Sequence, residues 1–200
     1  DNPRHIHWKT SARKGELMLR EYELNASTQM VLIPDLHAEV QASYGNQSTA
    51  ETAIELAASL AALGVRRKID IGMVCHAQDR FTVVPGHGQR TFHETLEVLA
   101  RVEPVGRLPL ERVLEREAAF LTNRSTLIII TPQLTPQLAD MLTRLRARHQ
   151  VVLILLKRES FVPKTEQRDR FDKTDLGLAA MLSLRHIPVY AVSADDDLRG

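Results

Sequence analysis

The stretch from Met30 to Glu39 reads MVLIPDLHAE and decides the fold. Its first four residues are all apolar and lack the alternation of a half-exposed strand, as in a strand that helices cover on both faces. An acidic residue, Asp35, follows closely. Because ligands of open α/β sheets bind beyond the carboxyl ends of the strands, this stretch predicts a central strand and the position of a functional site.

Five further segments have strand character, and helical patterns separate most of them. The six predicted strands are Met30–Ile33, Ile69–Val74, Phe81–Val84, Leu127–Ile130, Val151–Leu156 and Val189–Val192. The polar turn His76–Arg80 joins the second and third as a hairpin, which predicts one antiparallel edge strand. The rhythm predicts an α/β fold: a doubly wound, mostly parallel six-stranded sheet with helices on both faces. In that fold Asp35 and Thr131 end neighbouring strands and lie side by side.

Capping patterns predict where helices begin. Ser48 with Glu51, and Thr91 with Glu94, have capping-box spacing, and Thr135 precedes a proline at the first helical position. Gly64 is placed to end the first of these helices. The polar, proline-containing segment Lys157–Lys173 is expected to be a long solvated connection.

Composition limits the class of protein. A chain of 200 residues supports one sizeable core. Lys and Arg number 26 against 25 Asp and Glu, so no overall field draws the chain to nucleic acid. The single cysteine, Cys75, excludes an internal disulfide and favours a reducing compartment. No apolar run reaches the roughly 18 residues of a membrane span.

The opening segment carries a signature, DNPRHIHWKTSARKGELMLR. It resembles the start of the conserved region in a bacterial family known as domain of unknown function number fifty-eight. The matching residues are Asp1, Arg4, Ile6, Trp8, Ser11, Ala12, Arg13, Gly15, Glu16, Leu17, Leu19 and Arg20. The resemblance implies a signature segment over 1–25 packed on a von Willebrand factor A-like domain over 26–200. It also implies a cytoplasmic domain whose parent protein is anchored by an upstream membrane segment, and we expect the chain to be a fragment of that parent.

Domains of this kind often hold Mg²⁺ or Mn²⁺ with an Asp-x-Ser-x-Ser run after the first strand. Here the corresponding residues are Asp35, His37 and Glu39, and Thr131 stands after the fourth strand, where a second Asp is expected. Hard cations prefer oxygen ligands, so we expect a degenerate site that binds no metal. The alternative is a rewired site in a metal-dependent hydrolase or a metal-gated ligand-binding domain, since all three side chains can ligate a metal.

The leading interpretation is a non-enzymatic protein-interaction module. The resemblance implies a MoxR-type AAA+ ATPase as partner, because genes of the family often neighbour genes for such ATPases. Arg4, Trp8, Lys9 and Arg13 of the signature are the candidate partner-binding residues.

Other chemistry-bearing residues have simpler interpretations. His5 and His7 lack a third ligand, so we expect surface or packing roles for them. Cys75 is expected to be a buried free thiol. The run Pro85–Gln89 contains one Gly-x-Gly but lacks the lysine and hydroxyl of a phosphate loop, which predicts a turn.

Overall fold

The computed structural model describes residues 29–121, 125–163 and 173–196, with the side chains of 173–176 left aside. The signature segment 1–25 therefore lies outside the described residues, together with its candidate partner-binding residues and His5 and His7. The strands of the main sheet are β1 (Gln29–Pro34), β4 (Asp70–His76), β5 (Arg80–Gly86), β6 (Thr126–Thr131), β7 (Gln150–Leu156) and β8 (Val189–Val192). The helices are α2 (Thr49–Arg67), α3 (Gly88–Leu99), α4 (Leu110–Arg116), α5 (Pro136–Leu145) and α6 (Lys173–Leu184).

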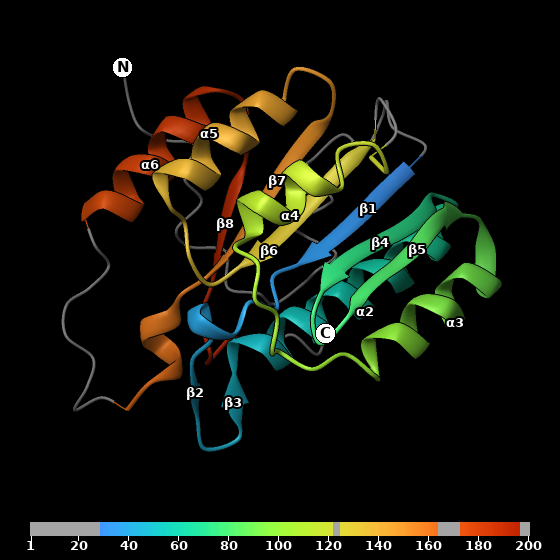
Figure 1. Ribbon diagram of the computed structural model, residues 1–200, viewed down its shortest axis with the longest axis horizontal. Helices are drawn as coiled ribbons and strands as arrows, with labels where there is room; N and C mark the ends of the chain where they lie inside the picture. Colours follow the sequence, from blue (N-terminus) through green and yellow to red (C-terminus); the bar gives the residue numbers. More distant parts are fainter. Residues whose placement is uncertain (1–28, 122–124, 164–172, 197–200) are drawn as a thin grey trace.

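The main sheet has six strands in the order β5-β4-β1-β6-β7-β8 (Figure 1). The central strand β1 is parallel to both neighbours, with Leu32 opposite Met73 of β4 and Ile128 of β6. Only the edge strand β5 is antiparallel to its neighbour. All six predicted strands are present, and the predicted doubly wound, mostly parallel sheet with one antiparallel edge strand is confirmed.

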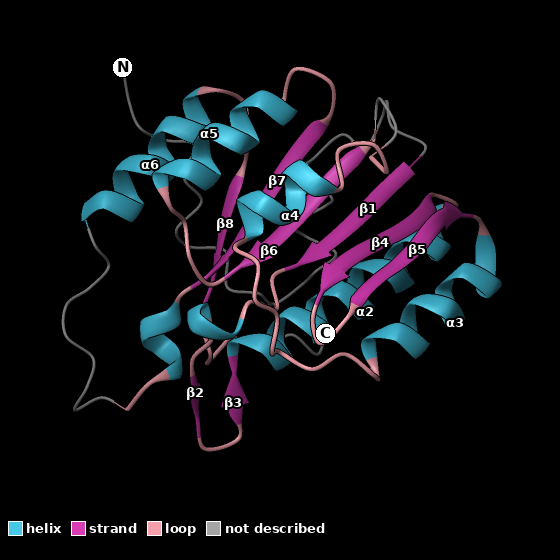
Figure 2. Cartoon of the chain, in the orientation of Figure 1, coloured by secondary structure: helices cyan, strands magenta, loops and turns pink. Residues whose placement is uncertain are grey.

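Helices cover both faces of this sheet (Figure 2). Alternate residues of β1 point to opposite sides: Leu32 packs in a cluster with α2 and α3, and Ile33 in a cluster with α4, α5 and α6. Both clusters are built from apolar side chains that are almost fully buried. The continuous apolar runs of the sequence are therefore explained by strands that have no solvent-facing side.

A short hairpin and two short helical turns complete the described chain. The hairpin pairs β2 (Ser43–Tyr44) with β3 (Gln47–Ser48) between β1 and α2, and it projects from the carboxyl edge of the sheet (Figure 1). The turns span Ala38–Val40 and Arg158–Phe161. Phe161 is 1% exposed and belongs to the core, so the prediction of a solvated connection from Lys157 was wrong at its start. Residues 164–172 of that connection lie outside the described residues.

Two of the three predicted helix starts are confirmed. Ser48 accepts a hydrogen bond from the Ala50 backbone N–H at 3.2 Å, and Thr135 accepts one from Leu138 at 3.1 Å. The start at Thr91 was wrong, because α3 begins at Gly88. Gly88 has φ +80 and lets the chain pass directly from strand to helix. The turn predicted over Pro85–Gln89 is therefore reduced to His87, between the end of β5 and the start of α3.

Thr91 is instead an internal residue of α3, and its side chain packs against Gly86. A Cβ at Gly86 would lie 2.6 Å from the Thr91 hydroxyl oxygen. Glu94 pairs with Arg90 on the same helix at 3.1 Å. The capping-box spacing was therefore a coincidence of two residues that face different surroundings.

The predicted role of Gly64 as a helix stop was also wrong. Helix α2 continues to Arg67 and ends on Lys68, which adopts the left-handed conformation with φ 58. Gly64 serves packing instead, since a Cβ there would lie 2.7 Å from Cγ1 of Ile71 and 3.1 Å from Cε of Met30. Its missing side chain lets α2 lie close to the sheet.

Among the described residues, none of the helices is both long and apolar enough to cross a bilayer.

A pair of glycine substitutions tests this packing. Gly64→Ala is expected to lower the free energy of unfolding by about 1–3 kcal/mol, because the added methyl overpacks the contact with β4. Gly177→Ala in α6 has open space within 4 Å, so it should raise stability by up to about 1 kcal/mol through helix propensity alone. Urea denaturation of both variants measures the difference, and equal effects at the two positions would contradict the packing role.

Candidate functional site

Asp35 lies at the carboxyl end of β1, where strand β6 runs alongside. Its backbone N–H donates to the Ile130 carbonyl at 2.8 Å, which extends the ladder by one step. Its carboxylate accepts a hydrogen bond from the Thr131 hydroxyl at 2.6 Å and another from the His37 backbone N–H at 3.1 Å. The predicted juxtaposition of Asp35 and Thr131 at the switch point is therefore confirmed.

The surroundings of Asp35 disfavour its charge. The residue is 5% exposed, and this burial raises the pKa of its carboxyl above the ordinary 3.8. The hydrogen bonds from Thr131 and His37 act in the opposite direction, and the negative charge of Glu111 adds to the rise. Desolvation is the largest of these effects, so the carboxyl is held closer to its neutral form than an exposed aspartate.

A hydrogen-bond network connects this position to the projecting hairpin. The Gln41 side-chain amide donates to the backbone carbonyls of Asp35 at 2.9 Å and His37 at 3.1 Å. The Thr49 hydroxyl donates to the Gln41 side-chain oxygen at 2.8 Å and accepts from the Ala42 backbone N–H at 3.0 Å. The polar groups after β1 thus fix the base of the hairpin.

The loop before α4 crosses the same edge of the sheet. Gly106 donates its backbone N–H to the Leu36 carbonyl and accepts from the Ala38 N–H, each at 2.9 Å. A side chain at Gly106 would collide with the backbone carbonyl oxygens of Leu36 and His76. Only glycine permits this close crossing, and the crossing brings α4 over the ends of β1 and β4.

A second polar cluster lies at the carboxyl end of α4, where Glu117 caps the helix. The Glu117 carboxylate accepts two hydrogen bonds from the Arg80 guanidinium, both at 2.8 Å, and lies 2.8 Å from Nε2 of His76. Glu117 is only 3% exposed, whereas the Arg80 side chain is half exposed. The hydrogen bonds from Arg80 hold the pKa of Glu117 below its usual 4.5, and the contact with His76 acts in the same direction.

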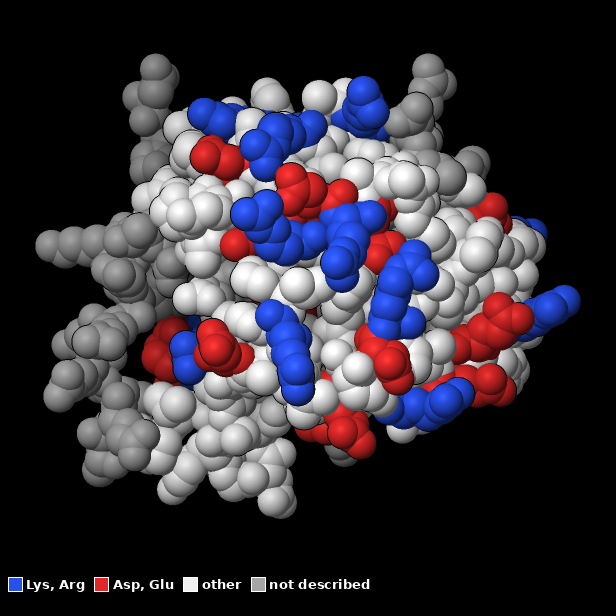
Figure 3. All heavy atoms as spheres, viewed as in Figure 1, with Lys and Arg blue, Asp and Glu red and all other residues white. Residues whose placement is uncertain are grey.

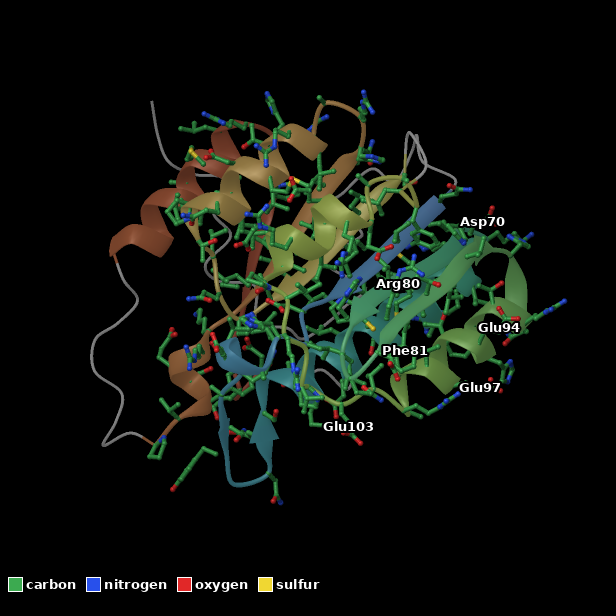
Figure 4. All side chains as sticks on the ribbon, in the orientation of Figure 1. Asp70, Arg80, Phe81, Glu94, Glu97 and Glu103 are labelled. Carbon is green, nitrogen blue, oxygen red and sulfur yellow. The ribbon has the colours of Figure 1, made fainter. Side chains whose placement is uncertain are left out.

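This cluster joins α4 to both strands of the edge hairpin. Figure 4 shows Arg80 and Phe81 together at the start of β5, and Glu103 in the loop at the carboxyl edge, far from Asp70 at the amino end of β4. Sequence reasoning missed the cluster. The signal was present, because Glu117 interrupts an apolar helical pattern at Leu110, Val113, Leu114 and Leu121.

The residues after β1 do not fit a Mg²⁺ or Mn²⁺ site. His37 contacts Asp35 only through its backbone N–H, and Glu39 is exposed on the short helical turn. Within the part of the chain that the structure describes, His, Cys, Asp and Glu form no group of three able to hold a metal ion. A hard cation needs about six oxygen ligands, and Asp35 offers one carboxylate whose two oxygens already accept hydrogen bonds.

Cys75 is confirmed as a buried free thiol. It packs with Leu36, Ala50, Ala77 and Val102. Burial raises the pKa of the thiol to about 12, so it stays protonated at neutral pH. A protonated, enclosed thiol is a poor nucleophile and a poor metal ligand.

Comparison with known proteins supplies the family context for this geometry. A family model described as "Protein of unknown function DUF58" matches residues 1–174. The matched range includes the opening signature as well as Asp35, Thr131 and Glu117. No curated protein matches the chain.

Substitution of Asp35 separates a hydrogen-bonding role from a charged one. Between pH 3.8 and the raised folded pKa, the folded state retains a proton that the unfolded chain releases, so stability falls as pH rises through that window. Asp35→Asn removes this loss while keeping an acceptor for His37. We expect the variant to be at least as stable as the parent at pH 7, with a flatter pH dependence above about 4.

Asp35→Ala removes both hydrogen-bond acceptors and should lower the free energy of unfolding by about 1–3 kcal/mol. Chemical denaturation from pH 4 to 8 compares the three proteins, and calorimetric titration with Mg²⁺, Mn²⁺ and Zn²⁺ accompanies it. Binding heat in the parent that Asp35→Asn abolishes would establish the metal-site alternative.

Glu117→Gln tests the second cluster. Because the pKa of Glu117 is lowered, its contribution to stability is present above pH 4.5 and is lost as pH falls below that value through the folded pKa. The variant should lose about 1–3 kcal/mol at pH 7 and should show a shallower loss of stability in acid. Glu115→Gln, which removes an exposed pair with Arg112, is the control and should leave both unchanged. Equal behaviour of the two variants would refute the role given to Glu117.

Proposed function

The chain belongs to the family of proteins of unknown function DUF58, and we propose that it is a non-enzymatic protein-interaction module. In this proposal the domain has the von Willebrand factor A-like fold, with a degenerate cation site that binds no metal. It works as an adaptor for a MoxR-type AAA+ ATPase.

The strand order supports the assignment to that plan. A central first strand, an antiparallel edge strand after the first helix and a switch point between β1 and β6 are the features that the resemblance implies. Fold alone does not fix function. Support for an interaction role therefore comes from the chemistry at the switch point.

The observation that carries the proposal is the state of the Asp35 carboxylate. It is buried, both its oxygens accept hydrogen bonds from the protein, and its pKa is raised. A cation-binding aspartate needs open coordination positions and a stable negative charge. A group engaged in this way is suited to joining β1, β6 and the hairpin, which leaves surface recognition as the role that the domain best supports.

The identity of the partner comes from the resemblance. The opening signature, with Arg4, Trp8, Lys9 and Arg13, supplies the candidate contacts, since aromatic and arginine side chains dominate binding energy at protein interfaces. The proposal places the domain in the cytoplasm as part of a membrane-anchored parent protein, which agrees with the single, reduced cysteine.

A pull-down with the full chain tests the adaptor role. A MoxR-type ATPase should be retained by the parent protein, and Trp8→Ala or Arg13→Ala should weaken retention by about tenfold or more, as for interface hot spots. Arg90→Ala, on an exposed part of α3, is the control and should bind like the parent. Absence of any association at micromolar concentrations argues against the ATPase as partner.

A further inference from the structure

Four arginines gather where helices α5 and α6 end. Arg144, Arg146 and Arg148 follow one another at alternate positions, and Arg185 comes directly after α6. All four are exposed. Figure 3 shows Lys and Arg side chains along the upper edge of the molecule, over the helices labelled α5 and α6 in Figure 1.

Two hydrogen bonds, from Arg146 and from Arg185, join the ends of the two helices. Arg146 Nε donates to the His186 carbonyl at 3.3 Å, and Arg185 donates to the Thr143 hydroxyl at 3.2 Å. An Arg144 nitrogen lies 3.4 Å from the Met141 sulfur. Each contact uses part of a guanidinium and leaves other N–H groups for a ligand. Arg144, Arg146 and Arg185 are therefore held in place before any partner arrives, which lowers the entropy cost of binding.

None of the four arginines forms a salt bridge with a described residue, and the acidic residue next to them on α5 is the exposed Asp140, one turn before Arg144. The exposed arginines on other helices differ, since Arg90 pairs with Glu94 on α3 and Arg112 pairs with Glu115 on α4. The ends of α5 and α6 thus form a local positive surface on a chain with a formal net charge of only +1.

An exposed apolar side chain is the chain neighbour of Arg185. Leu184 is 82% exposed, immediately before Arg185. Cations near a helix C-terminus are favoured by the helix dipole. That effect accounts for basic residues here, but it does not account for an exposed leucine beside them.

We propose that Arg144, Arg146, Arg148, Arg185 and Leu184 form a docking surface for an acidic segment of a protein partner that also carries an apolar side chain. The inference rests on the proposed interaction role and adds a second contact surface to it. Every cation at these helix ends is arginine, whose planar guanidinium binds carboxylates in a bidentate manner that lysine cannot match.

The confined charge favours a protein segment over an extended polyanion. Acidic side chains alternate with basic ones on the adjoining face over α4 (Figure 3), where Glu111 and Glu115 lie among Arg112 and Arg116. A membrane plane or a nucleic-acid duplex would meet these carboxylates as well and be repelled by them. A short acidic segment can occupy the arginines alone.

The test uses the full chain and a fluorescein-labelled peptide rich in Glu and containing Leu. Binding measured by fluorescence anisotropy should weaken as salt increases. The double variant Arg144→Glu/Arg148→Glu should weaken it by about tenfold or more, because like charges then face each other. Leu184→Ala should weaken it by a smaller factor. The control Arg90→Glu, in which an exposed arginine of α3 is reversed, should bind like the parent protein.

Competing ligands decide the class of partner. The charge-inverted Lys peptide, inorganic phosphate, and vesicles of phosphatidylcholine with or without phosphatidylserine are measured in parallel, and the proposal expects none of them to match the acidic peptide. Preference for phosphatidylserine vesicles, no peptide binding, or binding that the double variant does not change would overturn it. If the signature variants abolish ATPase association while the arginine variants leave both measurements unchanged, this surface is wrong and the proposed function stands.

Discussion

The hydrogen bond from Thr131 to Asp35 joins the two central strands at the edge where a doubly wound fold places its ligands. It forms between groups that are both nearly inaccessible to water. A buried acceptor without a partner is costly, so the donors around Asp35 must be supplied by the protein itself. Thr131 and the His37 backbone supply them, and the switch point becomes part of the structural framework.

The polar groups around this bond organise the whole carboxyl edge. Gln41 and Thr49 carry the network to the hairpin, while Gly106 brings the loop before α4 across the strand ends. Glu117 then ties α4 to the edge hairpin through Arg80.

Two parts of the chain remain as candidates for partner contact. One is the opening signature, and the other is the arginine group at the ends of α5 and α6. They differ in chemistry, because Trp8 offers a large aromatic anchor and the arginines offer localised positive charge. The arginine group therefore extends the proposed adaptor role by a second contact surface.

The sequence by itself determined which segments form buried strands, and it predicted one contact of the site. Continuous apolar runs require burial on both faces, and strand ends bring Asp35 beside Thr131. Local patterns failed where neighbours from elsewhere in the chain intervened: Thr91 packs on Gly86, and Gly64 makes room for Ile71. Only the tertiary structure assembled Arg80, His76 and Glu117, and only burial made Asp35 a structural group. Desolvation and long-range hydrogen bonds depend on which surfaces meet, and residue spacing does not encode that.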